Sequence, residues 1–158
     1  MKKKNLDCLD KKLIRILSKD GQISMGDMAM RLSVTMPTVR SRIKNLIEAG
    51  MLKIAGLINP DNHPELLTAL VGLSIQSDGK LNEEVEKLAN LDQVSWVAVV
   101  TGRYDVFAEV LVSGGMAELN NLLTHIIPKV GRVIRTETFI VMKSKNKWSC
   151  MPKGLENW

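Results

Sequence analysis

Residues 35–50, TMPTVRSRIKNLIEAG, constrain this chain more than any other stretch, because their pattern fits a short helix with one apolar side. At about 100° per residue, Val39, Ile43 and Leu46 fall on one side of such a helix, and polar residues fall opposite. The Thr35 hydroxyl can cap the first turn, and Gly50 can end the helix in a left-handed conformation. The sequence therefore predicts a helix with a buried anchor and a polar outer face.

The outer face of this predicted helix suits a helix that enters the major groove of DNA. Small polar side chains let the backbone approach the base edges, and flanking arginines meet phosphates. The candidate DNA-binding residues are Thr35, Met36, Pro37, Thr38, Arg40, Ser41, Arg42, Lys44 and Asn45. Taken alone, the segment fits equally well an amphipathic surface helix with solvated arginines.

The residues before this segment favour the DNA interpretation. Apolar residues repeat at helical spacing within residues 6–19, at Leu9, Leu13, Ile16 and Leu17. Residues 24–27, Ser-Met-Gly-Asp, have the form of a capping box that opens a second short helix. Because only a brief turn separates this second helix from Thr35, the three helices form the pattern of a helix-turn-helix.

The positive charge of the chain lies in the same region. Residues 1–50 hold 11 Lys and Arg against 5 Asp and Glu, a net charge of +6, whereas residues 51–158 hold 11 basic and 12 acidic residues. This placement indicates a nucleic-acid partner for the first third, since phosphate neutralisation drives binding to any sequence. A disordered, lysine-rich N-terminus is the alternative explanation for the lysines at positions 2–4.

Composition excludes several other classes of protein. The chain is 45% hydrophobic and 25% charged, as is ordinary for a globular protein, and it contains no apolar run of membrane-spanning length. The N-terminus lacks the apolar core of a signal peptide, so we expect a cytoplasmic protein. Cys8 and Cys150 have no CxxC spacing, and His63 and His125 stand isolated. We therefore expect reduced thiols and neither a metal site nor a cofactor.

The second half alternates between strand-like and helix-like segments. Asn59-Pro60-Asp61-Asn62-His63-Pro64 reads as a linker, and strands are predicted at residues 66–76, 94–100, 106–112 and 132–142. Helices are predicted at residues 80–90 and 116–127, the second ended by Pro128. This β-α-β-β-α-β order is that of a ferredoxin-like domain, an antiparallel sheet with both helices on one face.

The other face of that sheet also needs a cover. We expect Val97, Val99, Phe107 and Leu111 on it, and a second copy of the chain to cover it. The fold expected is thus α+β. A winged helix-turn-helix domain at residues 1–58 and a linker at 59–65 precede a ferredoxin-like domain at 66–142, and a tail of uncertain order follows at 143–158.

Two blocks of sequence, one in each half, carry a family pattern. The first is LDCLDKKLIRILSKDGQIS, followed by Thr38-Val39, Arg42-Ile43 and Glu48-Ala49-Gly50-Met51-Leu52. The second is Val97-x-x-Val100-Thr101-Gly102-Arg103-Tyr104-Asp105, closing on Val133-x-x-Thr136-x-Thr138. Over residues 6–142 the chain resembles the Lrp/AsnC group, the leucine-responsive or feast/famine transcriptional regulators. The tail after Lys143 has no counterpart in that pattern.

The resemblance implies a regulator that binds double-stranded DNA, dimerises through its C-terminal sheet and assembles further, often to octamers. It also implies a small effector, commonly an amino acid, near the Gly-x-Tyr-Asp turn. The candidate effector-binding residues are Thr101, Gly102, Arg103, Tyr104, Asp105, Thr136 and Thr138. The residue chemistry fits such a ligand, because Gly102 can expose backbone donors to a carboxylate and Asp105 can accept from an ammonium group. A hairpin turn that serves only geometry is the alternative interpretation.

Two other functions stay open at this point. An enzyme that modifies tetrapyrroles can share this double architecture, but it would need histidines directed into a pocket, and we expect no catalytic residues here. An effector-independent architectural DNA-binding protein would keep the first domain and lack the ligand.

Overall fold

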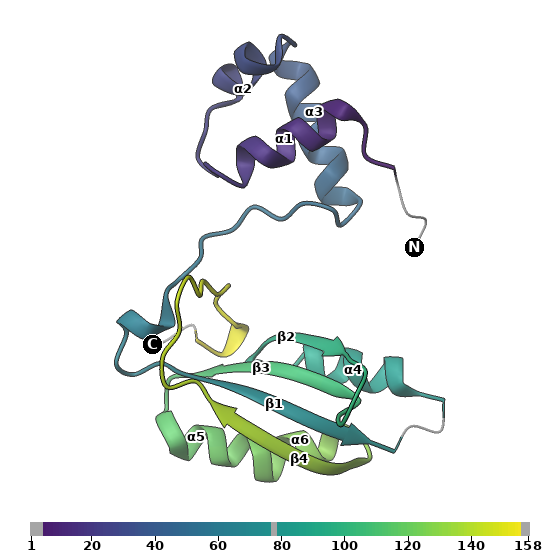
Figure 1. Cartoon of the computed structure of the whole chain (residues 1–158), viewed down its shortest axis with the longest axis vertical. Helices are drawn as coiled ribbons and strands as arrows, with labels where there is room; N and C mark the ends of the chain where they lie inside the picture. Colours follow the sequence, from purple (N-terminus) through teal and green to yellow (C-terminus); the bar gives the residue numbers. More distant parts are fainter. Residues whose placement is uncertain (1–4, 77–78, 156–158) are drawn as a thin grey trace. The chain divides into compact units, whose positions relative to one another are not determined.

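The computed structural model describes residues 5–76 and 79–155 and divides into two compact units (Figure 1). The first unit ends at Gly56 and the second begins at Leu57. In the part of the chain that is described, every helix is too short or too polar to cross a bilayer.

Three short helices form the first unit, each opened by a polar cap. They are α1 (Cys8–Leu17), α2 (Met25–Leu32) and α3 (Met36–Glu48). Their first turns are capped by the side chains of Asp7, Ser24 and Thr35, and Asp7 forms a reciprocal capping box with Asp10. The helices enclose one apolar core, in which Leu13, Met28 and Val39 are almost fully buried.

The turn between α2 and α3 depends on Ser33, which has a φ of 54°. This left-handed residue ends α2 and lets α3 start within three residues. The predicted helix-turn-helix is therefore formed, but the expected wing is not, because residues 52–57 contain no strand.

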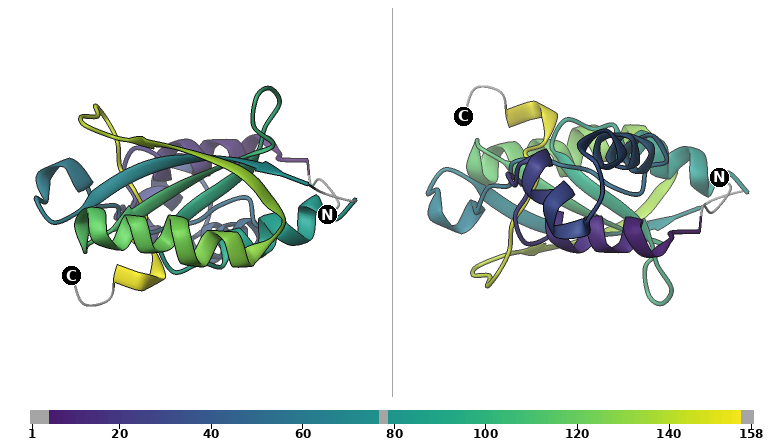
Figure 2. Two further views of the ribbon diagram at one scale, coloured as in Figure 1. Left: turned by 90° about the horizontal axis from the view of Figure 1, so that it is seen from below. Right: turned by 90° about the horizontal axis from the view of Figure 1, so that it is seen from above.

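The second unit is a four-stranded antiparallel sheet with its helices on one side. The strands are β1 (Leu67–Ile75), β2 (Val94–Val99), β3 (Val106–Val112) and β4 (Val133–Ile140), in the order β2-β3-β1-β4. The helices are α4 (Leu81–Ala89), α5 (Gly115–Asn121) and α6 (Ile127–Val130). The left view of Figure 2 shows the green α5–α6 segment lying along one side of the strands.

Helix α5 does not stop at Pro128 as expected. It continues through a π-helical turn, Leu122–Ile126, into α6, where Pro128 stands in the first turn. The Ile127 N–H donates to the Leu122 carbonyl, which is the long-range bond of a π-helix. The π-helical turn changes the hydrogen-bond register directly before Pro128, which has no N–H to donate.

The core of this unit lies between the sheet and its helices. Alternate residues of β1 and β3 face inward and pack against Leu119, Leu122 and Ile127. These strand residues include Ala69, Val71, Leu73, Val106, Ala108 and Val110, none of which is measurably exposed. The period-2 pattern of the sequence predicts this face of both strands.

The expected assignment of β2 to the two faces is wrong. The register of β2 against β3 shifts near the start of β2, so that two residues oppose one there. Beyond this bulge Val97 pairs with Ala108, and Val99 pairs with Val106. Because directly paired residues share a face, Val97 and Val99 lie on the helix side and not on the outer face.

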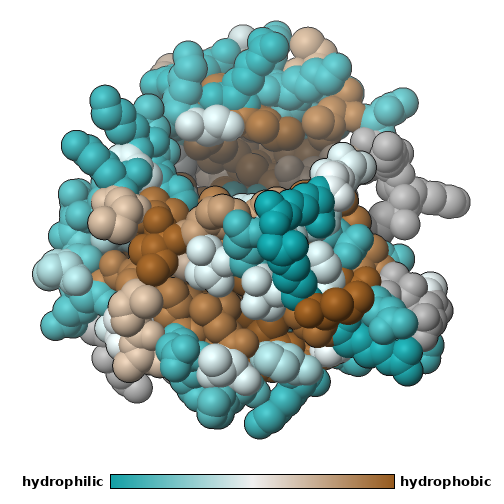
Figure 3. Space-filling view, turned by 60° about the horizontal axis from the view of Figure 1, so that its bottom comes forward, coloured by the Kyte–Doolittle hydropathy of each residue, from teal (hydrophilic) through white to brown (hydrophobic). Residues whose placement is uncertain are grey.

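The outer face of the sheet is therefore built from a different set. Beside Phe107 and Leu111, as expected, it carries Trp96, Ala98, Leu70 and Phe139. Trp96 is 43% exposed and Phe139 is 44% exposed, whereas Leu111 is completely buried. The second unit thus keeps large apolar side chains at its surface, and Figure 3 shows brown residues among teal ones across the lower part of the view.

One end of the outer face is covered by Tyr104, and the other end by the tail. The Tyr104 ring lies over Gly72, and a Cβ built at Gly72 would meet the ring at 2.8 Å. At the other end, tail residues 143–155 are ordered: Leu155 is 2% exposed and Ser149 is 4% exposed. The sequence pattern left the order of this tail open.

We expect Gly72→Ala to destabilise the protein by about 1–3 kcal/mol, because the new methyl group must displace the Tyr104 ring from the sheet. Urea unfolding measures the loss. Gly56→Ala is the matched control, since a Cβ at Gly56 meets nothing within 4 Å. Equal stability of the two variants would contradict this packing.

Candidate DNA-binding face and effector turn

Helix α3 presents the predicted outer face to solvent. Its anchor residues Val39, Ile43 and Leu46 are buried in the first unit. The exposed candidates are Thr35, Met36, Pro37, Arg40, Ser41, Lys44 and Asn45, while Thr38 and Arg42 are partly buried. The helix therefore separates an apolar anchor from a polar face, as its periodicity predicts.

Hydroxyl groups define the first turn of α3. The Thr38 N–H donates to Thr35 Oγ1 at 3.4 Å, and the two threonine hydroxyls lie 2.9 Å apart. Because its hydroxyl is paired within the turn, Thr38 is held in one orientation at the end of the helix that carries a partial positive charge.

Arg42 has partners in α1 that sequence spacing did not reveal. Its Nη1 lies 2.5 Å from Asp7 Oδ2 and 3.2 Å from Asp10 Oδ1. Asp10 is 3% exposed, so this guanidinium compensates a nearly buried carboxylate and ties α3 to the start of α1. The pair Asp7 and Asp10, three residues apart in a first turn, is the signal that could have indicated such a partner.

The same contacts shift two pKa values. The Asp10 backbone N–H and the Arg42 guanidinium hold the pKa of Asp7 below its ordinary value of 3.8, although desolvation opposes them. The carboxylate of Asp7, in turn, raises the pKa of Arg42. Arg40 is exposed, and Lys44 lies 3.7 Å from Glu48 in an exposed i,i+4 pair.

The candidate effector turn closes the hairpin between β2 and β3. Gly102 has a φ of 121°, a conformation that favours glycine. Asp105 fastens the turn to the end of β1, since its N–H donates to Leu73 O at 3.0 Å and its Oδ2 accepts from the Ile75 N–H at 2.9 Å. One carboxylate oxygen of Asp105 is thus engaged in a hydrogen bond that holds the turn against β1.

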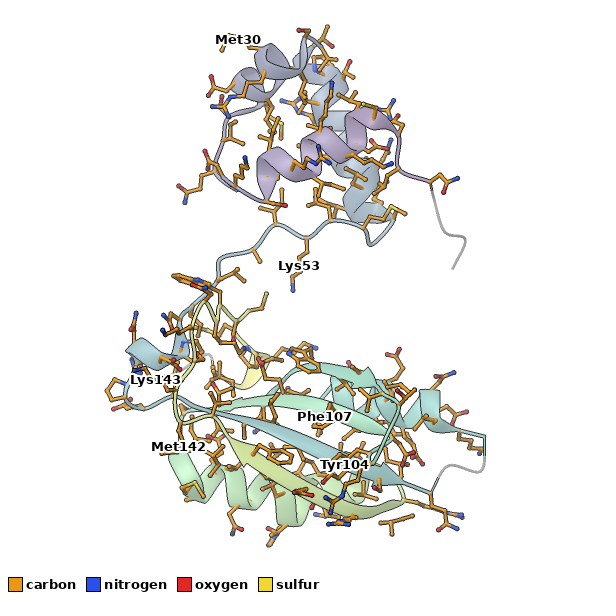
Figure 4. The ribbon with its side chains drawn as sticks, viewed as in Figure 1. Met30, Lys53, Tyr104, Phe107, Met142 and Lys143 are labelled. Atoms are coloured by element: carbon orange, nitrogen blue, oxygen red, sulfur yellow. The ribbon has the colours of Figure 1, made fainter. Side chains whose placement is uncertain are left out.

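Around Tyr104 the structure gathers the predicted candidate Arg103 and two charged residues that the sequence did not single out, Arg135 and Glu137. The Tyr104 hydroxyl donates to Glu137 Oε2, which also lies 3.7 Å from both Arg103 and Arg135. The Tyr104 and Phe107 rings meet edge to face at 5.5 Å, and Figure 4 labels both on the sheet. Glu137 pairs with Gly72 across the strands. An acidic residue opposite a strand glycine is therefore the sequence feature that could have indicated this cluster.

The structure separates Thr136 and Thr138 from this group. Thr136 pairs with Leu73 and Thr138 pairs with Val71, both of which face the helices. Because paired residues share a face, the two threonines lie on the opposite side of β4 from Glu137. Residues 101–105 form one cluster, and the two threonines do not join it within a single chain.

Comparisons with known proteins agree with this architecture. The sequence model of the AsnC-type helix-turn-helix domain matches residues 6–47, and that of the Lrp/AsnC ligand binding domain matches residues 68–147. An uncharacterized HTH-type transcriptional regulator of Pyrococcus furiosus is 35% identical over 144 residues, which is 90% of this chain and 95% of the relative. The regulatory protein AsnC of Haemophilus influenzae is 27% identical over 141 residues, 89% of this chain and 93% of the relative.

Solved structures are similar over nearly the whole chain. The leucine response regulatory protein of Mycobacterium tuberculosis has a TM-score of 0.76 at 25% identity, covering 88% of this chain and 94% of its own. A transcriptional regulator of Neisseria meningitidis, solved as an L-Met complex, has a TM-score of 0.71 at 19% identity, covering 93% of this chain and 96% of its own. The second of these supports the fold.

We expect Arg42→Ala to lower the melting temperature of the first unit, and the exposed control Arg40→Ala to leave it unchanged. Because the pKa of Asp7 is lowered in the folded state, its contribution is present above pH 3.8 and is lost as the pH falls through the lowered value. Circular dichroism melts between pH 7 and pH 2.5 measure both effects. If acidification lowers the melting temperature of Arg42→Ala as much as that of the parent, the ion pair between Arg42 and Asp7 does not stabilise the position of α3.

Proposed function

Since the chain belongs to the Lrp/AsnC family of transcriptional regulators, we propose that α3 reads its operator and that a small effector acts through the second unit. The protein is a DNA-binding regulator, because its first unit is an AsnC-type helix-turn-helix and its relatives are named as transcriptional regulators. The tetrapyrrole enzyme is thereby excluded. A regulator of this kind acts beside the chromosome, so we infer a cytoplasmic location.

One observation carries the assignment of the DNA-binding face, namely the exposed polar side of α3 above its buried anchor. We assign Thr38, Ser41 and Asn45 to base edges and Arg40 and Lys44 to phosphates. Thr35, Met36 and Pro37 stand at the same end of the helix and complete this surface. Arg42 is assigned a different role, because its guanidinium is bound to α1 and orients the recognition helix.

An amino acid or related carboxylate is the effector that the turn at residues 101–105 suits best. The ligand carboxylate would meet the backbone donors beside Gly102 and the guanidinium of Arg103. The ligand ammonium would meet Asp105 at Oδ1, since Oδ2 accepts from Ile75. The match to a ligand-binding domain and the L-Met complex of a structural neighbour support this proposal. Thr136 and Thr138 would join the site only from another face or another copy of the chain.

Self-association through the outer face of the sheet is the third part of the proposal. Trp96 and Phe139 are large, apolar and exposed, and Phe107 lies between them in the sheet order. A second copy that packs against these residues would remove them from water and form a dimer. Because the effector turn lies beside this face, ligand affinity and assembly beyond the dimer, such as an octamer, would be linked reciprocally.

We expect Arg40→Ala to weaken binding to all DNA sequences and to reduce the salt slope by about one ion, because one phosphate contact is lost. Ser41→Ala should instead change which sequences are preferred. Binding curves at several salt concentrations, on fragments selected from genomic DNA, measure both effects. Lys87→Ala, an exposed cation of α4, is the control. Parent-like affinity and salt slope for Arg40→Ala would remove that residue from the interface.

We expect Asp105→Asn to bind an amino-acid effector about tenfold or more weakly, because the charge that meets the ammonium is removed. The asparagine oxygen can still accept from the Ile75 N–H, so the turn should keep its shape. Calorimetry on the twenty amino acids and light scattering with and without ligand measure affinity and assembly together. Glu83→Gln on α4 is the control. A parent that binds no amino acid would instead be an effector-independent architectural regulator.

A further inference from the structure

The C-terminal tail binds the segment that leads to the DNA-binding unit, residues 53–66, which includes the predicted linker at 59–65 and is called the linker below. The matched ligand-binding domain ends at residue 147, so most of this tail lies beyond it. The chain leaves β4 near Met142 and Lys143, which Figure 4 labels beside the start of the sheet domain. From there the tail makes three contacts with the linker and the sheet, and a fourth near its end.

The first contact joins Ser144 to Asp61. The Ser144 N–H and its hydroxyl both donate to Asp61 Oδ2, at 2.8 and 2.7 Å. Asp61 lies in the short 3-10 helix of the linker, Pro60–Asn62. The hydrogen bonds from Ser144, aided by the charges of Lys147 and Lys143, hold the pKa of Asp61 below its ordinary value, so the contact is maintained at neutral pH.

The second contact is an isolated antiparallel bridge between Ile58 and Ser149. Each residue donates its N–H to the carbonyl of the other at 2.9 Å. Such a pair of backbone bonds fixes the direction of the linker as well as its position. Ile58 is the second residue of the second unit, so the bridge acts where this unit begins.

The third contact anchors the tail to the sheet. Glu109 lies on the outer face of β3 and is 3% exposed, and Lys147 Nζ lies 2.7 Å from its Oε2. Lys147 also donates to the Ser149 hydroxyl at 2.7 Å. A buried carboxylate is costly without its cation, so the sheet itself holds residues 147–149 in place. Further along, the Gly154 N–H donates to the Asp92 carbonyl at 2.8 Å.

These contacts shorten the linker. In the first unit the Leu52 N–H still bonds to the Leu46 carbonyl, and the next backbone hydrogen bond along the chain is the bridge of Ile58 to Ser149. Residues 53–57 lie between, including Lys53, which Figure 4 labels. Five residues span at most about 17 Å, whereas the fourteen residues 53–66 would span at most about 48 Å.

We propose that the C-terminal tail is a positioning clamp for the linker, and that it thereby restricts the spacing of DNA half-sites that a dimer of this chain can bind. The inference rests on the proposed function, because it requires two DNA-binding units to engage one operator. In a dimer with two short tethers, the two DNA-binding units cannot both bind half-sites that lie on opposite faces of the duplex. In a dimer with longer tethers, both units can bind such half-sites, although the effective concentration of the second unit is lower.

The test compares operators whose half-sites are moved apart by 5 or 10 base pairs. The parent should bind the operator with the 5-base-pair insertion about tenfold or more weakly than the operator with the 10-base-pair insertion. The shorter insertion turns one half-site by half a helical turn, to the opposite face of the duplex, whereas the longer one keeps both half-sites on the same face. Two variants release the clamp. One ends at Lys143 and carries Glu109→Gln, which leaves no unpaired buried charge, and the other is Ser149→Pro, which removes the bridge donor. Both should bind the two insertions within about threefold of each other.

Trp148→Ala is the matched control, because Trp148 lies in the same tail and is 58% exposed. It should keep the parent's spacing preference. Circular dichroism confirms that each variant is folded, and the affinity for the unaltered operator should change little. A parent-like spacing preference in folded, clamp-released variants would overturn the proposal.

Hydrogen exchange on the parent gives a result that depends on no variant. The amides of Ile58 and Ser149 should exchange far more slowly than those of residues 53–57. Fast exchange at Ile58 would overturn the clamp even if every variant unfolds. A parent that binds no DNA at all contradicts the proposed function instead, so the two failures are distinguishable.

Discussion

A four-stranded sheet that receives helices on only one face must find other cover for its second face, and most of the second unit follows from this constraint. One end is covered by Tyr104, which folds back over Gly72. The other end is covered by the tail, where Lys147 and Ser149 contact the buried Glu109. Between them Trp96 and Phe139 stay exposed, so the surface left for a partner is limited by the chain itself.

The first unit meets a different requirement, because three helices of 8–13 residues are too short to be stable alone. Capping side chains begin each helix, and a small core holds them together. Arg42 adds a link between α3 and the capped start of α1, so the capping box of α1 and the orientation of the recognition helix depend on the same pair of aspartates. The orientation of α3 and the start of α1 are therefore stabilised by the same residues.

Sequence periodicity predicted the three helices, the β-α-β-β-α-β succession of the second half and the inward face of β1 and β3, because these follow from local spacing. It failed at β2, where a single bulge exchanges the faces, so that Trp96 and not Val97 lies outside. It also did not reveal the partners of Arg42 in α1, which lie 35 and 32 residues away. The order of the tail depends on the pairing of Lys147 with Glu109, and no local pattern encodes a contact across 38 positions.

The buried pair of Glu109 and Lys147 also has an evolutionary consequence. A carboxylate in the middle of a sheet face is tolerated only while the tail supplies its cation, so the two positions must change together. Homologues without this tail should carry an uncharged residue at the position of Glu109. For the same reason, a chimaera that borrows this sheet domain must inherit its last dozen residues as well.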